Sequence, residues 1–260
     1  MDYVIAPHDN HSFQDLFEFF KMDLSSLDPV NRHEWQKLCI THSPAHYTHE
    51  RLNVTLRYLA PITMDGAQRE IEPDLPWAEM HFQERVSGAP MNPPPSFTRW
   101  PHHYSDSSRH AQEGHFDHTY PERIWPQFAG KIRPMPRRGI RFAYGDLDDV
   151  VAMLQSNIMT RQAFLPIWFP EDTGATQGQR VPCTIGYHFQ YDPSIHSLGM
   201  TYMIRSCDLI RHFRNDVYMA VRLLQWVCAR LTQPDGGEMP MGVLVMHMMN
   251  LHMMVGDSHR

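Results

Sequence analysis

The sequence predicts an α+β domain whose mostly antiparallel or mixed sheet carries helices on one face and leaves the other face for a dimer partner. Three patterns support this prediction. Residues 183–190 alternate between apolar and polar side chains, which is the period of a strand with one buried face. Residues 217–231 repeat apolar side chains at helical spacing. Residues 241–255 form an apolar run that is too short for a membrane span and contains His247 and His252, which is typical of a core strand.

The remaining elements are predicted from local patterns in chain order. We expect helices over residues 13–22, 75–86 and 147–155, and strands over residues 52–59 and 163–169. Pro166 lacks an N–H donor, so the strand that contains it must lie at a sheet edge or include a bulge. The chain shows no internal repeat, and 260 residues with 42% apolar content are enough for one core. Residues 1–260 are therefore expected to form a single domain.

Residues 89–121 are rich in loop-forming residues, including three consecutive prolines, and are expected to be an insertion near the mouth of the functional site. The segment also carries five histidines, namely His102, His103, His110, His115 and His118. Imidazoles bind zinc, but no cysteine accompanies these histidines and their spacing matches no standard zinc pattern. We therefore expect no metal site here.

The composition argues against several functional classes. The formal net charge of −6 offers no basic surface for nucleic acid, so no direct nucleic-acid binding is expected. The four cysteines, Cys39, Cys183, Cys207 and Cys228, show neither a disulfide framework nor paired metal spacing. The sequence shows no signal peptide and no apolar run that is long enough to span a membrane. These observations favour a cytoplasmic enzyme.

A predicted hairpin brings a thiol close to an arginine. Asp192-Pro193-Ser194 supplies turn residues, and residues 198–206 form the returning strand. A turn centred near Ile195 places Cys183 opposite the level of Arg205 to Cys207, where cross-strand neighbours lie about 5 Å apart. A nearby cation lowers the pKa of a thiol, so the position suits a nucleophilic cysteine. The alternative is a buried structural cysteine, because free cysteine is among the most buried residue types.

Asn215 and Asp216 fall at the start of the helix that covers residues 217–231. Both are favourable N-cap residues. Asp216 therefore has two interpretations, a helix cap or a carboxylate that contacts a ligand.

Several short motifs together resemble the thymidylate synthases and their relatives, the pyrimidine nucleotide hydroxymethylases. The motifs occur in the order of that superfamily and are Ile124-Trp125, Tyr144-Gly145, Thr160-Arg161-Gln162, Val181-Pro182-Cys183, Arg205-Ser206-Cys207-Asp208 and Leu251-His252. The resemblance covers residues 79–252 and implies a homodimer with a thymidylate synthase-like fold. Thymidylate synthases have asparagine eleven residues after the motif arginine, whereas this chain has Asp216, as in phage deoxycytidylate hydroxymethylases.

The resemblance implies transfer of a one-carbon unit from 5,10-methylenetetrahydrofolate to carbon 5 of dCMP, a pyrimidine nucleoside monophosphate, giving 5-hydroxymethyl-dCMP. Cys183 would add to carbon 6 of the ring, and water would later add to an exocyclic methylene on carbon 5. Asp216, with Asn215 beside it, would recognise the base, because a carboxylate accepts from the amino group of cytosine and in its protonated form also donates to the ring nitrogen. Burial would raise the pKa of such an aspartate.

The same resemblance assigns roles to further residues. Glu79 corresponds to a glutamate that organises water and relays protons, with Glu84 as its rival, and Tyr144 to a tyrosine near the thiol. Arg205 and Ser206 would hold the phosphate, together with Arg161 from the second subunit. The remaining assignments are His252 to the sugar, and Trp125 and Asp208 to the folate.

Other functions in the same superfamily stay open. Thr184 follows the cysteine where thymidylate synthases have histidine, which argues against methylation of dUMP. Met254 stands where a tyrosine normally helps to bind the sugar, so CMP is an alternative substrate. The further alternatives are a thymidylate synthase that acts on dUMP and an inactive nucleotide-binding homologue.

Overall fold

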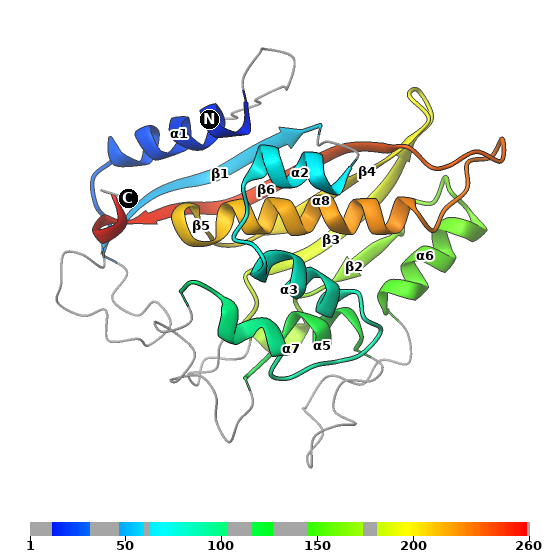
Figure 1. Ribbon diagram of the computed structural model, residues 1–260, viewed down its shortest axis with the longest axis horizontal. Coiled ribbons are helices and arrows are strands. Elements are labelled where there is room, and N and C mark those ends of the chain that lie inside the picture. The colour runs from blue at the N-terminus through cyan, green and yellow to red at the C-terminus, as the bar shows by residue number, and fades with distance from the viewer. Residues whose placement is uncertain are drawn as a thin grey trace.

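One mixed sheet organises the protein. The structure, a computed structural model, describes residues 12–31, 47–59, 63–102, 116–126, 145–173 and 181–258. Within these residues six strands form a sheet in the order β1-β6-β4-β3-β2, with β5 paired to β6 (Figure 1). The strands are β1 (Thr48–Tyr58), β2 (Phe164–Pro166), β3 (Thr184–Asp192), β4 (Ser197–Ile204), β5 (Cys207–Asp208) and β6 (Met241–Met254). The predicted α+β class with a mixed sheet is confirmed.

The sheet combines two antiparallel groups of strands. Strand β1 pairs antiparallel with β6, and β2, β3 and β4 pair antiparallel with one another in that order. Strands β4 and β5 both run parallel to β6. Strand β2 is the last in the order, so of the two predicted arrangements for the proline-containing strand, an edge position or a bulge, the structure has the edge position. It is shorter than predicted and ends at Pro166, which has no N–H to continue the ladder.

Helices gather on one face of the sheet. They are α1 (Phe13–Ser25), α2 (Met64–Ile71), α3 (Trp77–Arg85), α5 (Tyr120–Ile124), α6 (Leu147–Ser156), α7 (Pro170–Thr173) and α8 (Arg214–Cys228). Figure 1 shows α8 running across the sheet with α2 and α3 on the same side of it. Helix α8 packs on β4 and β6, and both α2 and α3 pack on α8. The predicted helices at residues 13–22, 75–86 and 147–155 are all present.

The two faces of the sheet differ in burial. Alternate residues of β4 and β6 are fully buried under the helices, and they include Met200, Tyr202, Ile204, Leu244, Met246 and Met248. Their neighbours on the opposite face, such as Thr201, Met203, Val243, Val245 and His247, are only half-buried. The period-two pattern therefore assigns the core to the helix side. No helix of the described residues is long and apolar enough to cross a membrane.

Candidate functional site

A cavity of about 240 Å³ lies between one end of the sheet and the helices above it. Cys183, just before β3, and Ser206, between β4 and β5, line the cavity together with Asp216 of α8. The opposite part of the wall comes from His81 and Arg85 of α3, Tyr120 of α5, Trp100 and His212. Pro94, Phe97 and residues 116–120 also line it, so the loop-rich segment 89–121 reaches the site. Side chains that are distant in sequence thus line one cavity.

The structure places Cys183 opposite Arg205, which confirms the predicted hairpin register. Thr184 pairs with Ile204, and the N–H of Arg205 donates to the carbonyl of Cys183 at 2.9 Å. The Arg205 guanidinium donates to the carbonyl of Pro182 at 2.9 Å and to that of Val181 at 3.3 Å. This arginine therefore fixes the backbone that leads into Cys183, and the thiol faces the cavity only half-buried.

Asp216 is the third residue of α8 and does not cap it. A π-helical turn, Leu209–Phe213, precedes α8, and the cap of that turn is Asp208, whose carboxylate accepts from the N–H groups of Ile210 and Arg211 at 3.0 Å each. The N-cap interpretation of Asp216 is thus wrong. Burial raises the pKa of Asp216 to about 7, although the Arg85 guanidinium opposes this shift.

Arg85 is a cavity residue that the sequence patterns did not identify. Its side chain is 5% exposed, and among the described residues its Nε has no hydrogen-bond partner. The guanidinium stacks on the ring of Tyr120 at 3.9 Å from the ring centre. A buried cation of this kind is favourable only when an acceptor approaches it. Arg85 and Asp216 therefore give the cavity a donor and an acceptor for a polar ligand.

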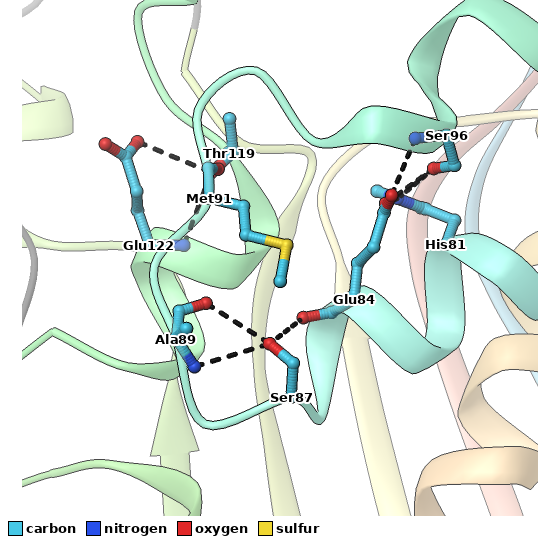
Figure 2. Close-up of polar contacts among 8 residues, drawn as sticks. All are labelled: His81, Glu84, Ser87, Ala89, Met91, Ser96, Thr119 and Glu122. Atoms are coloured by element: carbon cyan, nitrogen blue, oxygen red, sulfur yellow. Dashed lines mark hydrogen bonds and ion pairs between the residues drawn. The ribbon is translucent and has the colours of Figure 1, made fainter.

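Tyr120 lies near the thiol, in the place that was expected for Tyr144. Its hydroxyl oxygen accepts from the hydroxyl of Thr184, the residue after Cys183, at 3.1 Å. Thr119 fixes the start of α5 by accepting from the N–H of Glu122 and donating to the carbonyl of Met91 (Figure 2). Tyr144 itself lies outside the described residues, so its predicted role stays a prediction.

The two candidate glutamates of α3 have different surroundings. The Glu79 carboxylate accepts hydrogen bonds from Tyr218 at 2.6 Å, from Gln83 at 2.7 Å and from two nitrogens of Arg222 at 3.1 Å each. Burial alone would raise the pKa of Glu79, but these hydrogen bonds outweigh it and lower the pKa. Glu79 is not among the residues that line the cavity. It connects α3 to α8 instead.

Glu84 does not line the cavity itself but contacts His81, which does. Its carboxylate accepts from the Ser96 N–H at 2.6 Å and from the Ser96 hydroxyl at 2.5 Å (Figure 2). The Nδ1 atom of His81 lies 3.2 Å from the same carboxylate. Burial alone would raise the pKa of Glu84, but the bonds from His81 and Ser96 lower it. Glu84 therefore remains ionised and orients a histidine that lines the cavity.

Aromatic rings form a continuous part of the cavity wall. The ring of His81 stacks on Trp77 at 5.4 Å, Trp77 lies 5.9 Å from Trp100, and Trp100 stacks on His212 at 5.0 Å. His212 belongs to the π-helical turn, a type of distortion that is frequent at functional sites. These rings give the cavity an apolar surface that suits a flat ligand.

Asn215 and Trp125 serve packing rather than the cavity. The Asn215 amide donates to the Asp74 carboxylate and accepts from the Asp74 N–H, both at 2.9 Å. The indole of Trp125 is 2% exposed and donates to the carbonyl of Arg85 at 2.9 Å. Neither residue lines the cavity. Their predicted contacts with substrate and folate have no counterpart in the cavity wall.

Four further predicted residues also lie away from the cavity wall, and one of them is Arg205, whose guanidinium donates to the backbone carbonyls of Pro182 and Val181. His252 is buried on β6, opposite Asp208 of β5, and its Nδ1 is 3.1 Å from the Asn250 side-chain oxygen. Arg161 is exposed in the loop before β2. The Asp208 carboxylate caps the π-helical turn. Their binding roles stay predictions.

The described residues contain no group of three histidine, cysteine or acidic side chains that could hold a metal ion. Of the five histidines in the loop-rich segment, His103, His110 and His115 lie outside the described residues. In comparisons with known proteins, no family model matches the chain and no curated protein sequence is significantly similar to it.

Proposed function

We propose that the protein is a pyrimidine nucleotide C5-hydroxymethylase of the thymidylate synthase-like fold, with dCMP as its substrate. The observation that carries the proposal is the meeting of Cys183, Ser206 and Asp216 in one cavity. The resemblance assigns these three residues to the nucleophile, the phosphate site and the base site. Cys183 and Ser206 lie at the end of the β3–β4 hairpin, and α8 brings Asp216 to the same cavity.

The polar groups of the cavity suit a cytosine ring. Asp216 has a pKa raised to about 7, so both its ionised and its protonated forms are accessible near neutral pH. The ionised form accepts from the exocyclic amino group, and the protonated form also donates to ring nitrogen 3. Arg85 adds a donor in the same cavity that is free to meet a ring oxygen or nitrogen. The half-buried thiol of Cys183 would then attack carbon 6 of the ring.

The ring wall is a suitable surface for the folate cosubstrate. When bound, 5,10-methylenetetrahydrofolate supplies the one-carbon unit that becomes the hydroxymethyl group. Trp77, Trp100 and His212 would hold its flat rings, because they present stacked aromatic surfaces to the cavity. Trp125 and Asp208, which the resemblance assigns to this task, lie outside the cavity wall.

A homodimer forms part of the proposal. Arg161 is exposed on its own chain and would reach the phosphate only across an interface. The half-buried face of the sheet, with Met203, Val243 and Val245, would be covered by the second copy. This arrangement would bury apolar side chains that a monomer leaves partly in water.

The direct test is an incubation with 5,10-methylenetetrahydrofolate and each of dCMP, CMP, dUMP and UMP, read by mass spectrometry of the nucleotide. We expect a hydroxymethyl product from dCMP and no increase in dihydrofolate absorbance. A methylated product with stoichiometric dihydrofolate would identify a synthase instead. Preferred turnover of CMP would replace the deoxynucleotide in the proposal.

A second test needs no folate. Addition of a thiolate to carbon 6 makes carbon 5 nucleophilic, so the enzyme in D₂O should exchange the hydrogen on carbon 5 of dCMP for deuterium. Proton NMR of the nucleotide measures this exchange. If neither exchange nor product appears with any of the four nucleotides, the inactive nucleotide-binding alternative holds.

A further inference from the structure

His81 is a histidine whose ring is fixed on three sides at the cavity. The side chain belongs to α3 and is 8% exposed. One face of the ring stacks on Trp77 with an angle of 13° between the planes. The Tyr120 ring approaches edge-on at 6.3 Å, and the Tyr120 hydroxyl contacts the residue next to Cys183. His81 therefore lies close to the place where the reacting ring would bind.

Hydrogen bonds to Glu84 determine which nitrogen of His81 carries the proton. The ionised Glu84 carboxylate only accepts, and it takes both the N–H and the hydroxyl hydrogen of Ser96. The Ser96 oxygen, whose hydrogen is used, lies 3.3 Å from His81 Nδ1 and accepts there as well. In the neutral ring Nδ1 must therefore carry the proton and donate it. Figure 2 shows the His81 ring beside the Glu84 carboxylate that accepts this hydrogen bond. Nε2 is left as the basic nitrogen, and no described residue hydrogen-bonds to it.

Burial, more than the surrounding charges, keeps the ring of His81 neutral at pH 7. The titratable groups that face it are Glu84 and Arg85 of α3, His212 of the π-helical turn, and Tyr120 of α5. Burial lowers the pKa of His81 to about 4, and Arg85 and His212 act in the same direction against Glu84. The neutral ring is the form that accepts a proton, and the Glu84 carboxylate, which opposes the lowering of the pKa, would stabilise the imidazolium that forms.

We propose that His81 is the general base that activates water for addition to the one-carbon unit, and that Glu84 is the residue that positions it. The inference rests on the proposed function, since it assigns the water-adding step of that reaction. It also separates the two glutamates of α3, because Glu84 acts through His81 while Glu79 has no access to the cavity.

The step balances with groups that the cavity contains. After Cys183 has added and the one-carbon unit has been transferred, the pyrimidine carries an exocyclic methylene on carbon 5. The water oxygen bonds to this methylene carbon while the methylene π pair shifts toward carbon 4 and nitrogen 3, and Nε2 of His81 takes one water proton. The electron pair then returns to form the C5=C6 double bond as the C6–S bond breaks, and Cys183 leaves as a thiolate. His81 releases its proton to solvent, and nothing is oxidised or reduced.

Other groups of the cavity are less suited to this step. Burial raises the pKa of Tyr120, so its hydroxyl stays protonated at neutral pH. Asp216 is assigned to the base edge of the substrate. Among the described residues that line the cavity, His81 thus combines a free basic nitrogen with a fixed orientation.

The experiment compares His81→Gln with His49→Gln as a matched control. Glutamine places an amide near the position of Nε2 but accepts no proton. His49 is also 8% exposed and hydrogen-bonds through Nδ1, to the carbonyl of Leu27, but it lies outside the cavity wall. We expect His81→Gln to lose roughly a hundredfold or more in hydroxymethyl product, the usual contribution of a general base, while His49→Gln stays near wild type. Deuterium exchange at carbon 5 should persist in both variants, because it precedes the water step.

Chemical rescue gives a readout that a structural role would not change. His81→Ala leaves a space beside Trp77, and added imidazole should restore product formation in proportion to the neutral imidazole concentration. Glu84→Gln should lower the rate of product formation. This variant should respond less to added imidazole, because the His81 ring still occupies its site. Product formation near wild type in His81→Gln, loss of exchange together with product, or failure of imidazole to rescue a folded His81→Ala would each overturn the assignment. Absence of exchange and product in the wild type would instead overturn the proposed function.

Discussion

The two sides of the α3–α8 pair use their polar side chains in opposite ways. On the outer side, a cluster that we term the helix clamp joins Glu79 and Gln83 of α3 to Tyr218 and Arg222 of α8, and the Glu79 carboxylate receives bonds from all three partners. On the cavity side, Asp216 has only a long contact, 4.0 Å, from the Cys207 thiol. Arg85 makes no ion pair there with any described residue.

This difference separates side chains that hold the helices together from side chains that have few polar partners among the described residues. A buried polar group without a partner costs the fold about 1 to 3 kcal/mol, whereas a satisfied one does not. The helix clamp therefore stabilises the protein. Asp216 and Arg85 do not stabilise it in this way, and poorly satisfied polar groups of this kind are frequent at functional sites.

The largest expected effect is the loss of turnover when the proposed nucleophile on the cavity side, Cys183, is replaced. Cys183→Ala should reduce turnover by on the order of a thousandfold or more, and it should also abolish deuterium exchange at carbon 5 while nucleotide binding stays measurable. Cys228→Ala is the matched control, since Cys228 is a buried free cysteine that contacts the carbonyl of Pro240. Product assays with both variants decide the point. Retained exchange in Cys183→Ala would remove the thiol from the mechanism.

The pH dependence of stability tests whether Asp216 is buried without a partner. Its folded pKa of about 7 lies above the unfolded value, so between pH 4 and pH 7 the unfolded chain loses the proton and the folded chain keeps it. Asp216 thus contributes stability at low pH that is lost as the pH rises through 7, at about 1.4 kcal/mol for each unit of pKa difference.

Asp216→Asn removes this titration. The stability of the variant relative to wild type should therefore be greater at pH 8 than at pH 5. Urea unfolding of both proteins at the two pH values measures the change, and other titrating groups cancel in the comparison. An equal difference at both pH values would show that Asp216 is ionised in the folded protein.

Replacing a residue of the helix clamp should lower the stability of the protein. In Glu79→Gln, an amide NH₂ group replaces one carboxylate oxygen and faces donors on Tyr218 or Arg222, so the free energy of unfolding should fall by about 1 to 3 kcal/mol. Glu18→Gln is the control, because Glu18 is exposed and accepts one hydrogen bond from Gln14. Urea unfolding ranks the two variants. A loss of rate in Glu79→Gln without a loss of stability would favour the proton-relay role that the resemblance assigns to Glu79.

The smallest effect concerns base recognition at the cavity. Asp216→Asn should move the ratio of rates on dCMP and dUMP toward dUMP by about tenfold or more, since one unsatisfied hydrogen bond is worth at least about 1.4 kcal/mol in such a site. Initial rates on both nucleotides give the ratio. If it does not change, Asp216 does not read the base.

Local periodicity predicted the longer helices and strands and the Cys183 hairpin, but it missed the short helices α2, α5 and α7 and the two-residue strand β5. The alternation of residues 183–190 and the turn at Asp192-Pro193-Ser194 fix a register that depends on nearby residues alone. The edge position of β2 also followed from one proline. Strand β1 begins at Thr48 rather than at residue 52, because its first residues are mostly polar and give no strand signal.

The helical wall of the cavity depends on contacts between distant segments, which a single sequence does not reveal. The functional side of α3 carries His81 and Arg85, so it has no apolar stripe to distinguish it from the outer side. The roles of Glu79 and Glu84 differ because their hydrogen-bond partners differ. These partners, Arg222 and Ser96, belong to other elements. The proximity of Tyr120 to Cys183 likewise arises only when α5 packs beside α3 and β2 and brings the Tyr120 hydroxyl to Thr184. The sequence could identify polar residues near the cavity. Their roles could be assigned only from contacts between distant segments in the folded protein.

The π-helical turn before α8 has a consequence for how base preference could change. Each residue of a helix turns the chain by about 100°, so the turn from Leu209 to Phe213 sets the angular phase of everything that follows. Deletion of one residue there would rotate the first turn of α8 and carry Asp216 away from the cavity wall, without altering any side chain. Under the proposed function, the length of this short segment would thus affect specificity as much as the chemical identity of the residue it orients.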